Sequence, residues 1–484
     1  MAGEQKEKKV DYKKIRLKFG FEIHQQLATQ HKLFCGCSTA MMEKNPIMVL
    51  TRKQHPVASE LGEFDIAAQH EYLRNRTFYY QVFSNESCLV ECDEEPPHEL
   101  NKEALETALQ VALLLNCSVP NEIHAMRKTV IDGSNTTSFQ RTMVVGLNGF
   151  LRHKGKKIEI KHVSLEEDAA AIVKEDESSA TFRLNRLGIP LIEVGTNIIT
   201  DCTPEEAQDI AYQIGMIVRS TGKAKKGLGT IRQDVNVSVR GGERVEIKGV
   251  QELGILAKVI SLEVERQLSL PKVAKEVRAA LPDGTTKFTR PLPGAARMYP
   301  ETDVEPVVIL AEYLARLKKN LPESWEVRLR KIKRTGLSDQ LAEQIVKSEY
   351  VDLFERIAKE RKVDASVVAN TFTSILKDLR RDQIPVDSLR DEHFHRIFDL
   401  LKRGTIAKEA IQPVLKELAR EPGRDVTDIV RSLGLEAITA TELKRIIRDV
   451  RSRNPDVPRD KILGLVMSRV RGRIDAKIVM KLVK

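Results

Sequence analysis

The hydrophobic periodicity of the chain changes near residue 304, and this change constrains the fold more than any other feature of the sequence. Between about residues 15 and 304, short stretches alternate apolar and polar residues with the period of two that strands require. After residue 304, the segments 310–319, 339–357 and 365–379 carry apolar residues at helical spacing. The pattern predicts an α+β protein, with a β-rich domain at 1–304 and helices after it.

The helical part is expected to have two sections, at 305–395 and at 396–484. In the last section short helical stretches are separated by Pro422-Gly423 and Asn454-Pro455, pairs that interrupt helices. The sequence shows no internal repeat and no low-complexity stretch.

Turn and cap residues divide the β-rich domain further. Helices are predicted at 101–115 and 204–220, the second with Thr203 as N-cap, Pro204 in its first turn and Thr221-Gly222 at its end. Four dipeptides predict tight turns of the kind that close hairpins: Asp132-Gly133, Asn148-Gly149, Gly241-Gly242 and Asp283-Gly284.

Composition places the chain among globular proteins, with 41% hydrophobic and 31% charged residues. No run approaches the roughly 20 apolar residues that a membrane helix needs. The first residues, MAGEQKEKKVDYKK, are charged and lack the apolar stretch of a signal peptide. We therefore expect a cytoplasmic protein with no membrane partner.

Positive charge is concentrated at the C-terminal end. Residues 401–484 contain 20 Lys and Arg against 11 Asp and Glu, so this stretch carries +9 of the chain's formal +10. A near-neutral body with a basic tail is typical of a protein whose tail meets a polyanion; the alternative is a solvated helical surface. Aromatic residues are sparse in the tail, so contacts to the phosphate backbone and to shape are expected rather than base stacking.

Six cysteines, at 35, 37, 88, 92, 117 and 202, are too few for a disulfide framework in a chain of 484 residues without a secretory signal. Cys35, Cys37, Cys88 and Cys92 could supply four thiolates to a zinc ion. Their spacing departs from the usual paired CxxC, and reduced, buried thiols are the favoured interpretation.

Polar side chains that carry chemistry lie on predicted strands of the first domain. In the segment 232–239, valines at 235, 237 and 239 alternate with Asp234, Asn236 and Ser238, which gives one apolar face and one face rich in oxygen. The segment 245–248 repeats the arrangement with Glu246 and Lys248. Because Gly241-Gly242 lies between the two segments, they are expected to pair as a hairpin that brings these polar groups onto one surface.

Further acids and one histidine follow the same alternation. Glu22 and His24 share a face in FEIH, Glu193 lies in the apolar strand PLIEV, and Glu166-Glu167-Asp168 precede a run of alanines. Carboxylates gathered on one surface are costly unless something neutralises them, and hard oxygen ligands with a single imidazole favour Mg²⁺ or Mn²⁺. Lys248 beside Glu246 would suit a nucleotide phosphate. The joint pattern predicts a metal–phosphate site, although each motif alone is also common on solvated surfaces.

Long motifs carry a resemblance to a known family. They include FGFEIHQQL, KLFCGCST, CDEEPPHELN, SLEEDAAA, RLGIPLIEVG, IRQDVNVSVRGG, VEIKGV and RPLPGAARMYPETD. Together they resemble the GatB/GatE family of tRNA-dependent amidotransferase subunits. FEIHQQL, PVASELGEFD and DEEPPH are closer to the archaeal-type E subunits than to the bacterial B subunits.

The resemblance implies a cradle-like catalytic domain, a helical domain and a YqeY-like helical tail that binds tRNA. The implied reaction uses ATP and Mg²⁺ to phosphorylate the γ-carboxylate of Glu on Glu-tRNA(Gln), which ammonia then converts to Gln-tRNA(Gln). Family positions that line the magnesium and phosphorylation site correspond to Glu22, His24, Glu167, Asp234 and Glu246, with Glu193 and Lys248 as neighbours. Lys248, Asn236 and Arg232 are expected to contact the nucleotide.

The implied partner is an asparaginase-like D subunit (GatD) that releases ammonia, in a heterodimer or a dimer of heterodimers. The chain departs from the family in one respect. E subunits usually carry an inserted domain, related to one in aspartyl-tRNA synthetases, before the segment LPDGTT. Here Pro271 is followed almost directly by Leu281, which begins that segment, so there is no room for the domain.

Two other classes of protein stay open: a non-catalytic tRNA-binding scaffold, and an ATP-grasp-like ligase acting on a free acid. P-loop, Rossmann and serine-hydrolase motifs are absent from the sequence.

Overall fold

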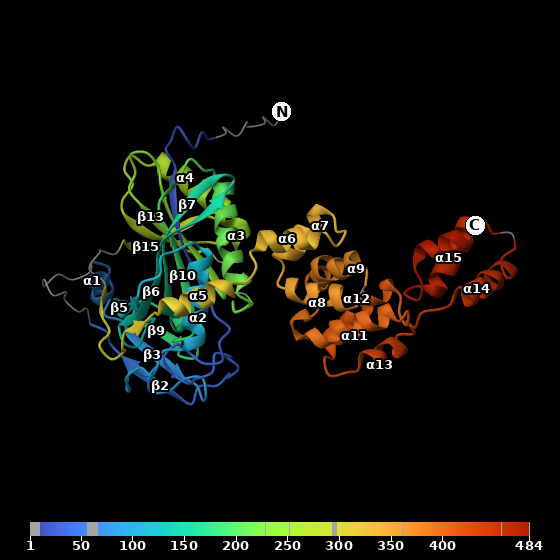
Figure 1. The fold of residues 1–484 in the computed structure, drawn as a ribbon, viewed down its shortest axis with the longest axis horizontal. Coiled ribbons are helices and arrows are strands. Elements are labelled where there is room, and N and C mark those ends of the chain that lie inside the picture. The colour runs from blue at the N-terminus through green and yellow to red at the C-terminus, as the bar shows by residue number, and fades with distance from the viewer. Residues whose placement is uncertain are drawn as a thin grey trace. The chain divides into compact units, whose positions relative to one another are not determined.

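The computed structural model describes residues 10–55, 66–227, 229–250, 252–292, 298–361, 363–455 and 457–483. The chain forms two compact units, residues 1–324 and residues 325–484 (Figure 1). The first unit contains all the described strands and the second is helical, so the α+β organisation expected from the change in periodicity is confirmed.

A large mixed sheet is the frame of the first unit. Its order is β15-β14-β13-β12-β1-β10-β7-β6-β5-β16, with β11 paired to β1. All the described neighbours pair antiparallel except β13 and β14. Their bounds are β1 Lys18–Gln26, β5 Ala125–Thr129, β6 Phe139–His153, β7 Lys156–Glu167, β10 Pro190–Thr196, β11 Ile199–Thr200, β12 Ile231–Ser238, β13 Val245–Val250, β14 Glu276–Ala280, β15 Thr286–Pro291 and β16 Met298–Pro300.

Helices cover one face of this sheet. Alternate residues of the central strands, such as Phe21, Val163 and Val235, form a single buried core with α2 (Lys102–Leu114), α3 (Pro204–Ser220) and α4 (Leu256–Ser269). In Figure 1, α3 runs alongside the sheet. Because strand side chains alternate, burying one set on the helices directs the other set to the opposite face.

Smaller elements complete the first unit. A four-stranded sheet has the order β2-β3-β9-β8 and its own buried cluster, which includes Phe78, Tyr80 and Phe182. A two-stranded ribbon joins β4 to β17. The bounds are β2 Met48–Arg52, β3 Thr77–Val82, β8 Ala171–Glu175, β9 Ser179–Arg183, β4 Glu122–Ile123, β17 Val307–Val308, α1 Ile66–Leu73 and α5 Ala311–Lys319.

Local sequence signals located several of these elements. Helix α3 begins with the Thr203 capping box and ends where predicted, and α2 has Asn101 as its N-cap. Of the four predicted turns, Asn148-Gly149 does not close a hairpin, because it lies inside β6. There, a Cβ on Gly149 would stand 2.5 Å from the Leu115 carbonyl oxygen, so glycine makes room for the end of α2. Lys154-Gly155, with positive φ at both residues, connects β6 to β7.

The second unit consists of short helices. The expected helix at 339–357 is interrupted by Ser348, the C-cap of α7. The segment expected at 365–379 is helical throughout, with a π-helical turn in the middle (Thr371–Ile375). The bounds are α6 Trp325–Lys333, α7 Asp339–Lys347, α8 Val351–Arg361, α9 Ala365–Asn370, α10 Leu376–Arg381, α11 Asp391–Lys402, α12 Ile411–Arg420, α13 Val426–Ser432, α14 Ala440–Ser452, α15 Arg459–Val470 and α16 Ala476–Leu482.

The observed divisions of the chain lie away from the expected boundaries at 304 and 395. The first unit continues to residue 324, because α5 contributes Leu317 to the core beneath the large sheet. Residue 395 lies inside α11, where Phe394, Ile397 and Phe398 are buried. A separate buried cluster begins only at Ile438 and holds α14, α15 and α16 together.

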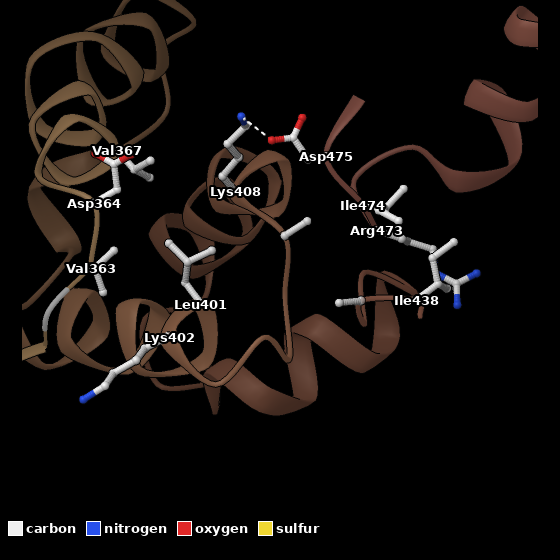
Figure 2. A pocket seen from close by; sticks show the side chains of 12 residues that line it. Val363, Asp364, Val367, Leu401, Lys402, Lys408, Ile438, Arg473, Ile474 and Asp475 are labelled. Carbon is white, nitrogen blue, oxygen red and sulfur yellow. Dashed lines mark hydrogen bonds and ion pairs between the residues drawn. The ribbon is translucent and has the colours of Figure 1, made fainter. Parts of the chain in front are cut away.

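A cavity of about 420 Å³ separates this last cluster from the preceding helices of the second unit. Figure 2 shows Lys408 directed at Asp475 across it, with a 2.7 Å ion pair. Val363 and Leu401 line the side of the preceding helices, and Ile438 and Ile474 line the other side. Among the residues described, no helix is long and apolar enough to cross a membrane.

Candidate active site

The face of the large sheet opposite the helices is polar. It is called here the polar face, and its side chains come from seven adjacent strands, β13 to β5: Glu246, Lys248, Arg232, Asp234, Asn236, Glu22, His24, Glu193, His162, Glu166, Thr142 and Lys128. Most of them alternate with apolar residues, many of which belong to the helix-covered core. The predicted hairpin of β12 and β13 is present, with Asn236 opposite Glu246.

Glu22, Asp234 and Glu246 form a first cluster, the Glu22 group. Glu22 lies opposite Asp234 in the register of β1 and β12. One carboxylate oxygen from each of the three lies within 4.8 Å of the others. The Lys248 ammonium lies 2.9 Å from Asp234 and 2.6 Å from Glu246.

His24, Glu166 and Glu193 form a second cluster, the Glu193 group, whose ligand atoms also lie within 4.8 Å of one another. His24 lies opposite Glu193 in the register of β1 and β10, with Nε2 3.2 Å from Oε2. Lys128 contacts both acids, at 3.0 Å from Glu166 and 3.3 Å from Glu193. His162 adds a contact of 2.6 Å to Glu193.

Charge is unevenly compensated between the two clusters. Burial raises the pKa of Glu193, but Lys128 and hydrogen bonds from His162 and His24 outweigh it and hold that pKa well below its ordinary value. Burial also raises the pKa of Asp234, but the charges of Lys248 and His24, with hydrogen bonds from Lys248 and the Gly249 amide, together lower it. Burial and then the charge of Glu193 raise the pKa of Glu22. Glu22 is thus a carboxylate short of positive charge, the deficit that a bound cation would correct.

On the same face, the side chain of Asn236 has a buried oxygen, Oδ1, that lacks a hydrogen-bond donor within the described part of the chain. Buried polar atoms without a partner are uncommon and often mark the place of a missing water, ion or ligand. Asn236 lies opposite Glu246 and two residues after Asp234 on the same strand, so its oxygen is a further hard donor of the kind that Mg²⁺ accepts, next to the Glu22 group.

Glu167 belongs to neither cluster, although the family resemblance placed it with the residues of the magnesium and phosphorylation site. Its carboxylate is 3.3 Å from the Arg141 guanidinium and accepts the Arg141 backbone N–H. Strand β7 continues through Glu167, so Glu166, and not Glu167, shares a face with His162. The alternation of that strand was the signal that could have identified Glu166.

Arg232 and Lys248 both lie on the polar face, and both are already paired with acids. Arg232 donates to Asp168 at 2.8 Å, while Lys248 binds the Glu22 group. Lys128 and His162 were not anticipated, because a lone Lys or His on a strand is uninformative until the neighbouring strands are known.

The cysteine cluster is present in part. Thiols of Cys35, Cys37 and Cys88 lie within 4.8 Å of one another and of the Glu91 carboxylate, whereas Cys92 is outside this group. Cys35 donates a 2.9 Å hydrogen bond to Glu91. Three sulfurs and one carboxylate are a donor set that zinc accepts, and reduced, hydrogen-bonded thiols are the alternative.

Comparison with known proteins assigns the family. A family model described as the GatB/GatE catalytic domain matches residues 17–315, which contain the whole polar face. A second, described as the GatB domain, matches residues 352–484. The chain belongs to the GatB/GatE family. The resemblance inferred from the motifs is thereby confirmed, although the segments 56–65 and 293–297 of those motifs lie outside the described residues.

Relatives within the GatB/GatE family cover nearly the whole chain. The E subunit of glutamyl-tRNA(Gln) amidotransferase from Archaeoglobus fulgidus is 35% identical, with 98% of each chain aligned. The proteins of the same name from Methanocaldococcus jannaschii and Saccharolobus solfataricus are each 33% identical, over 97% and 98% of this chain and 98% of their own.

These relatives are longer than this member of the GatB/GatE family. The alignment with the Methanocaldococcus protein spans 618 positions, whereas this chain has 484 residues, so at least 134 aligned positions are gaps in this chain. In the structure, α4 ends at Ser269 and β14 begins at Glu276, with no additional domain between them. The absence of the inserted domain agrees with the expectation from the sequence.

Proposed function

We propose that this chain is the amidotransferase subunit that converts Glu-tRNA(Gln) to Gln-tRNA(Gln), using ATP and Mg²⁺, with ammonia from a partner subunit. The observation that carries the proposal is the polar face, where two acid clusters with two lysines lie inside the region matched to the GatB/GatE catalytic domain. The relatives' printed names support this substrate.

Different side chains of the polar face would bind the cations and the phosphates. The Glu22 group with Asn236, and the Glu193 group, would hold divalent cations. Bound Mg²⁺ would neutralise charge on the phosphates. Burial disfavours the charged form of Lys248, but Asp234 and Glu246 raise its pKa, so its ammonium stays charged near the phosphates at neutral pH. Glu167 is proposed to act from outside the clusters through Arg141.

The chemistry requires an activated carboxylate, because a free carboxylate has no good leaving group for ammonia to displace. Transfer of the γ-phosphoryl group of ATP to the γ-carboxylate of tRNA-bound Glu creates an acyl phosphate and ADP. Ammonia then attacks the carbonyl carbon, phosphate leaves, and the amide of Gln remains. The protein's part is to position the two substrates and to stabilise the transferred charge.

Turnover of ATP that depends on Glu-tRNA(Gln) tests the proposal. ATP consumption should be measured with Glu-tRNA(Gln), Asp-tRNA(Asn) and free glutamate, each with ammonium. We expect consumption with Glu-tRNA(Gln) and none with free glutamate. Turnover with free glutamate would favour a small-molecule ligase, and tRNA binding without any turnover would favour a scaffold.

The nitrogen source gives an independent prediction. The sequence has no evident glutaminase or asparaginase motif. The purified chain alone should therefore form Gln-tRNA(Gln) with ammonium salts but not with glutamine or asparagine. Amide-dependent product from the chain alone, measured by acid-gel separation of the aminoacyl-tRNA, would contradict the need for a partner.

An asparaginase-like D subunit is the partner that the family resemblance implies, in a heterodimer or a dimer of such pairs. The relatives are named as subunits, which supports an assembly of more than one kind of chain. The reaction is proposed to take place in the cytoplasm, where aminoacyl-tRNA is used by the ribosome.

The tail is proposed to bind tRNA through its phosphates. Lys444, Arg445 and Arg448 are exposed on α14, and no ion pair joins them to another residue that the structure describes. By contrast, Arg453 and Arg469 pair with Asp449 at 2.8 and 2.6 Å.

Replacing Lys444 and Arg448 together by Gln should weaken tRNA binding and reduce the slope of log K against log[salt] by about 1 for each lost phosphate contact. The double change of Arg453 and Arg469 to Gln removes the same charge from already paired groups and should alter the slope less. Filter binding at several salt concentrations measures both. Equal slopes in all three proteins would mean that the tail is a solvated surface.

A further inference from the structure

One edge of the polar face holds a buried acid between two arginines. Asp168 follows directly after β7, and its side chain is fully buried. Arg232 Nη2 lies 2.8 Å from one carboxylate oxygen, and Arg186 Nε lies 3.8 Å from the other. Gln26 donates a hydrogen bond of 2.5 Å to that second oxygen.

The two guanidinium groups bring more positive charge than Asp168 can balance. They flank a single carboxylate, and burial and the charge of Arg232 lower the pKa of Arg186 against the opposing effect of Asp168. Lys225, whose ammonium also interacts with the charge of Asp168, adds a third cation at this edge. Arg232 also interacts with the charges of Asp234 and Glu166, but Asp168 is the one acid that both guanidinium groups share, and two guanidinium groups held together suit a phosphate.

Both arginines are fixed and keep donors available. Arg186 donates to the carbonyl oxygens of Ala169 and Ala170, each at 2.7 Å, which holds its planar group in place. In the described part of the chain, Arg232 uses only Nη2, for Asp168. Their side chains are 25% and 26% exposed, so both arginines are partly accessible from solvent.

The position of the pair indicates which anion it meets. Arg232 lies opposite His24 in the register of β1 and β12. Its charge interacts with Asp234 of the Glu22 group and Glu166 of the Glu193 group. An anion bound by the pair would therefore lie beside both clusters proposed to hold cations, which is where a phosphoryl group in transfer must be.

We propose that Arg186 and Arg232, held in position by Asp168, bind the phosphoryl group that ATP transfers. This inference rests on the proposed function. In the step, a γ-carboxylate oxygen of Glu forms a bond to the terminal phosphorus, and the bond to the β,γ-bridging oxygen breaks with its electron pair leaving on ADP. The guanidinium groups neutralise the non-bridging oxygens, and Asp168 is a positioning residue.

A purely structural ion pair is the competing explanation, and the chain offers a matched control for it. Arg266 on α4 is also 26% exposed and also lies 2.8 Å from a fully buried acid, Glu263. Its helix packs on the opposite, helix-covered face of the sheet. Arg266→Met thus breaks an ion pair of the same kind far from any phosphate.

Equilibrium binding separates the explanations without relying on turnover. Dissociation constants should be measured for ADP and for the ATP analogue with a β,γ-imido bridge, both with Mg²⁺. For Arg186→Met and Arg232→Met we expect the analogue to bind about 10-fold or more weakly, as for the loss of a charge-assisted contact, and ADP to bind about as in the wild type. Arg232→Lys should recover part of the loss, and Arg266→Met should change neither constant.

Several results would overturn the assignment. Unchanged analogue binding in folded Arg232→Met protein would make the pair structural, and equal weakening of ADP and analogue would assign it to the inner phosphates. A rise in KM for Glu-tRNA with nucleotide binding intact would assign it to tRNA phosphates. Circular dichroism of each variant identifies loss of fold. If the wild type binds the analogue but shows no Glu-tRNA-dependent turnover, the proposed reaction fails while these constants still decide the role of the pair.

Discussion

Glu246→Gln should lower the rate of Gln-tRNA(Gln) formation by a factor of about 10² or more, the scale typical of losing one charged group that stabilises a transition state. Glu246 is buried on β13, contacts Lys248 at 2.6 Å and lies within the Glu22 group. The amide has the shape of the carboxylate but not its charge. The fold should therefore survive while cation binding and phosphoryl transfer are impaired.

The measurement is the single-turnover rate at saturating ATP and Glu-tRNA over a range of Mg²⁺ concentrations. Glu243→Gln is the control, because it makes the same chemical change at an exposed residue of the loop before β13. That control should retain wild-type activity. A Glu246→Gln protein that also retains it at high Mg²⁺ would remove the Glu22 group from the mechanism.

The second large effect concerns stability. Glu301→Gln should destabilise the first unit by about 3–5 kcal/mol, the usual range for breaking a buried ion pair from one side. The Glu301 side chain is fully buried and accepts hydrogen bonds from Arg127 at 2.6 Å and Arg141 at 2.9 Å. Its loss leaves Arg141, itself 7% exposed, with only Glu167 as a close acid among the described residues.

The pH dependence of this effect has a definite sign. Burial raises the pKa of Glu301, but hydrogen bonds from Arg127 and the Asp303 amide and the charge of Arg141 lower it below its ordinary value. A carboxyl whose pKa is lower in the folded state stabilises that state at any pH above its unfolded pKa, about 4.3. The difference between wild type and Glu301→Gln should thus be constant from pH 8 to 5 and shrink as the pH falls below about 4.

Hydrogen exchange of the β5 and β16 amides in urea measures this stability. Fluorescence of the single tryptophan, Trp325, reports the second unit and serves as an internal control that should not change. A difference that grows toward acid pH, or a loss below about 1 kcal/mol, would mean that the Arg127–Glu301–Arg141 cluster contributes little to the fold.

Features that depend on a few consecutive residues were predictable. The spacing of neighbouring residues predicts the capping box of α3, the apolar and polar faces of β12 and β13, and the change from strands to helices. The exception arose where a contact between separate segments overrode the local pattern. Asn148-Gly149 resembles a hairpin turn, but its glycine is required by the approach of Leu115 from a different segment.

The composition of the site depended on contacts between distant segments. Alternation predicted that Glu22, His24, Asp234 and Glu246 point to polar faces, but not that the acids divide into two clusters. That division follows from strand order, because β1 lies between β12 and β10 and gives Glu22 to one side and His24 to the other. Lys128 and His162 joined the site only through contacts with acids on other strands, and Arg186, in the loop before β10, joined it through its ion pair with Asp168.

The sequence by itself determined the family, the fold class and the kind of chemistry, because motifs, periodicity and residue types are properties of neighbouring positions. Only the tertiary structure decided which charges meet. Register and strand order select Glu166 over Glu167 for the Glu193 group, and place Asp168 between Arg186 and Arg232. The physical reason is that a side chain's electrostatic environment extends over a few ångströms of space. The neighbours within that distance come from separate segments of the chain, such as Asp168 and Arg232 or the paired strands β1 and β12.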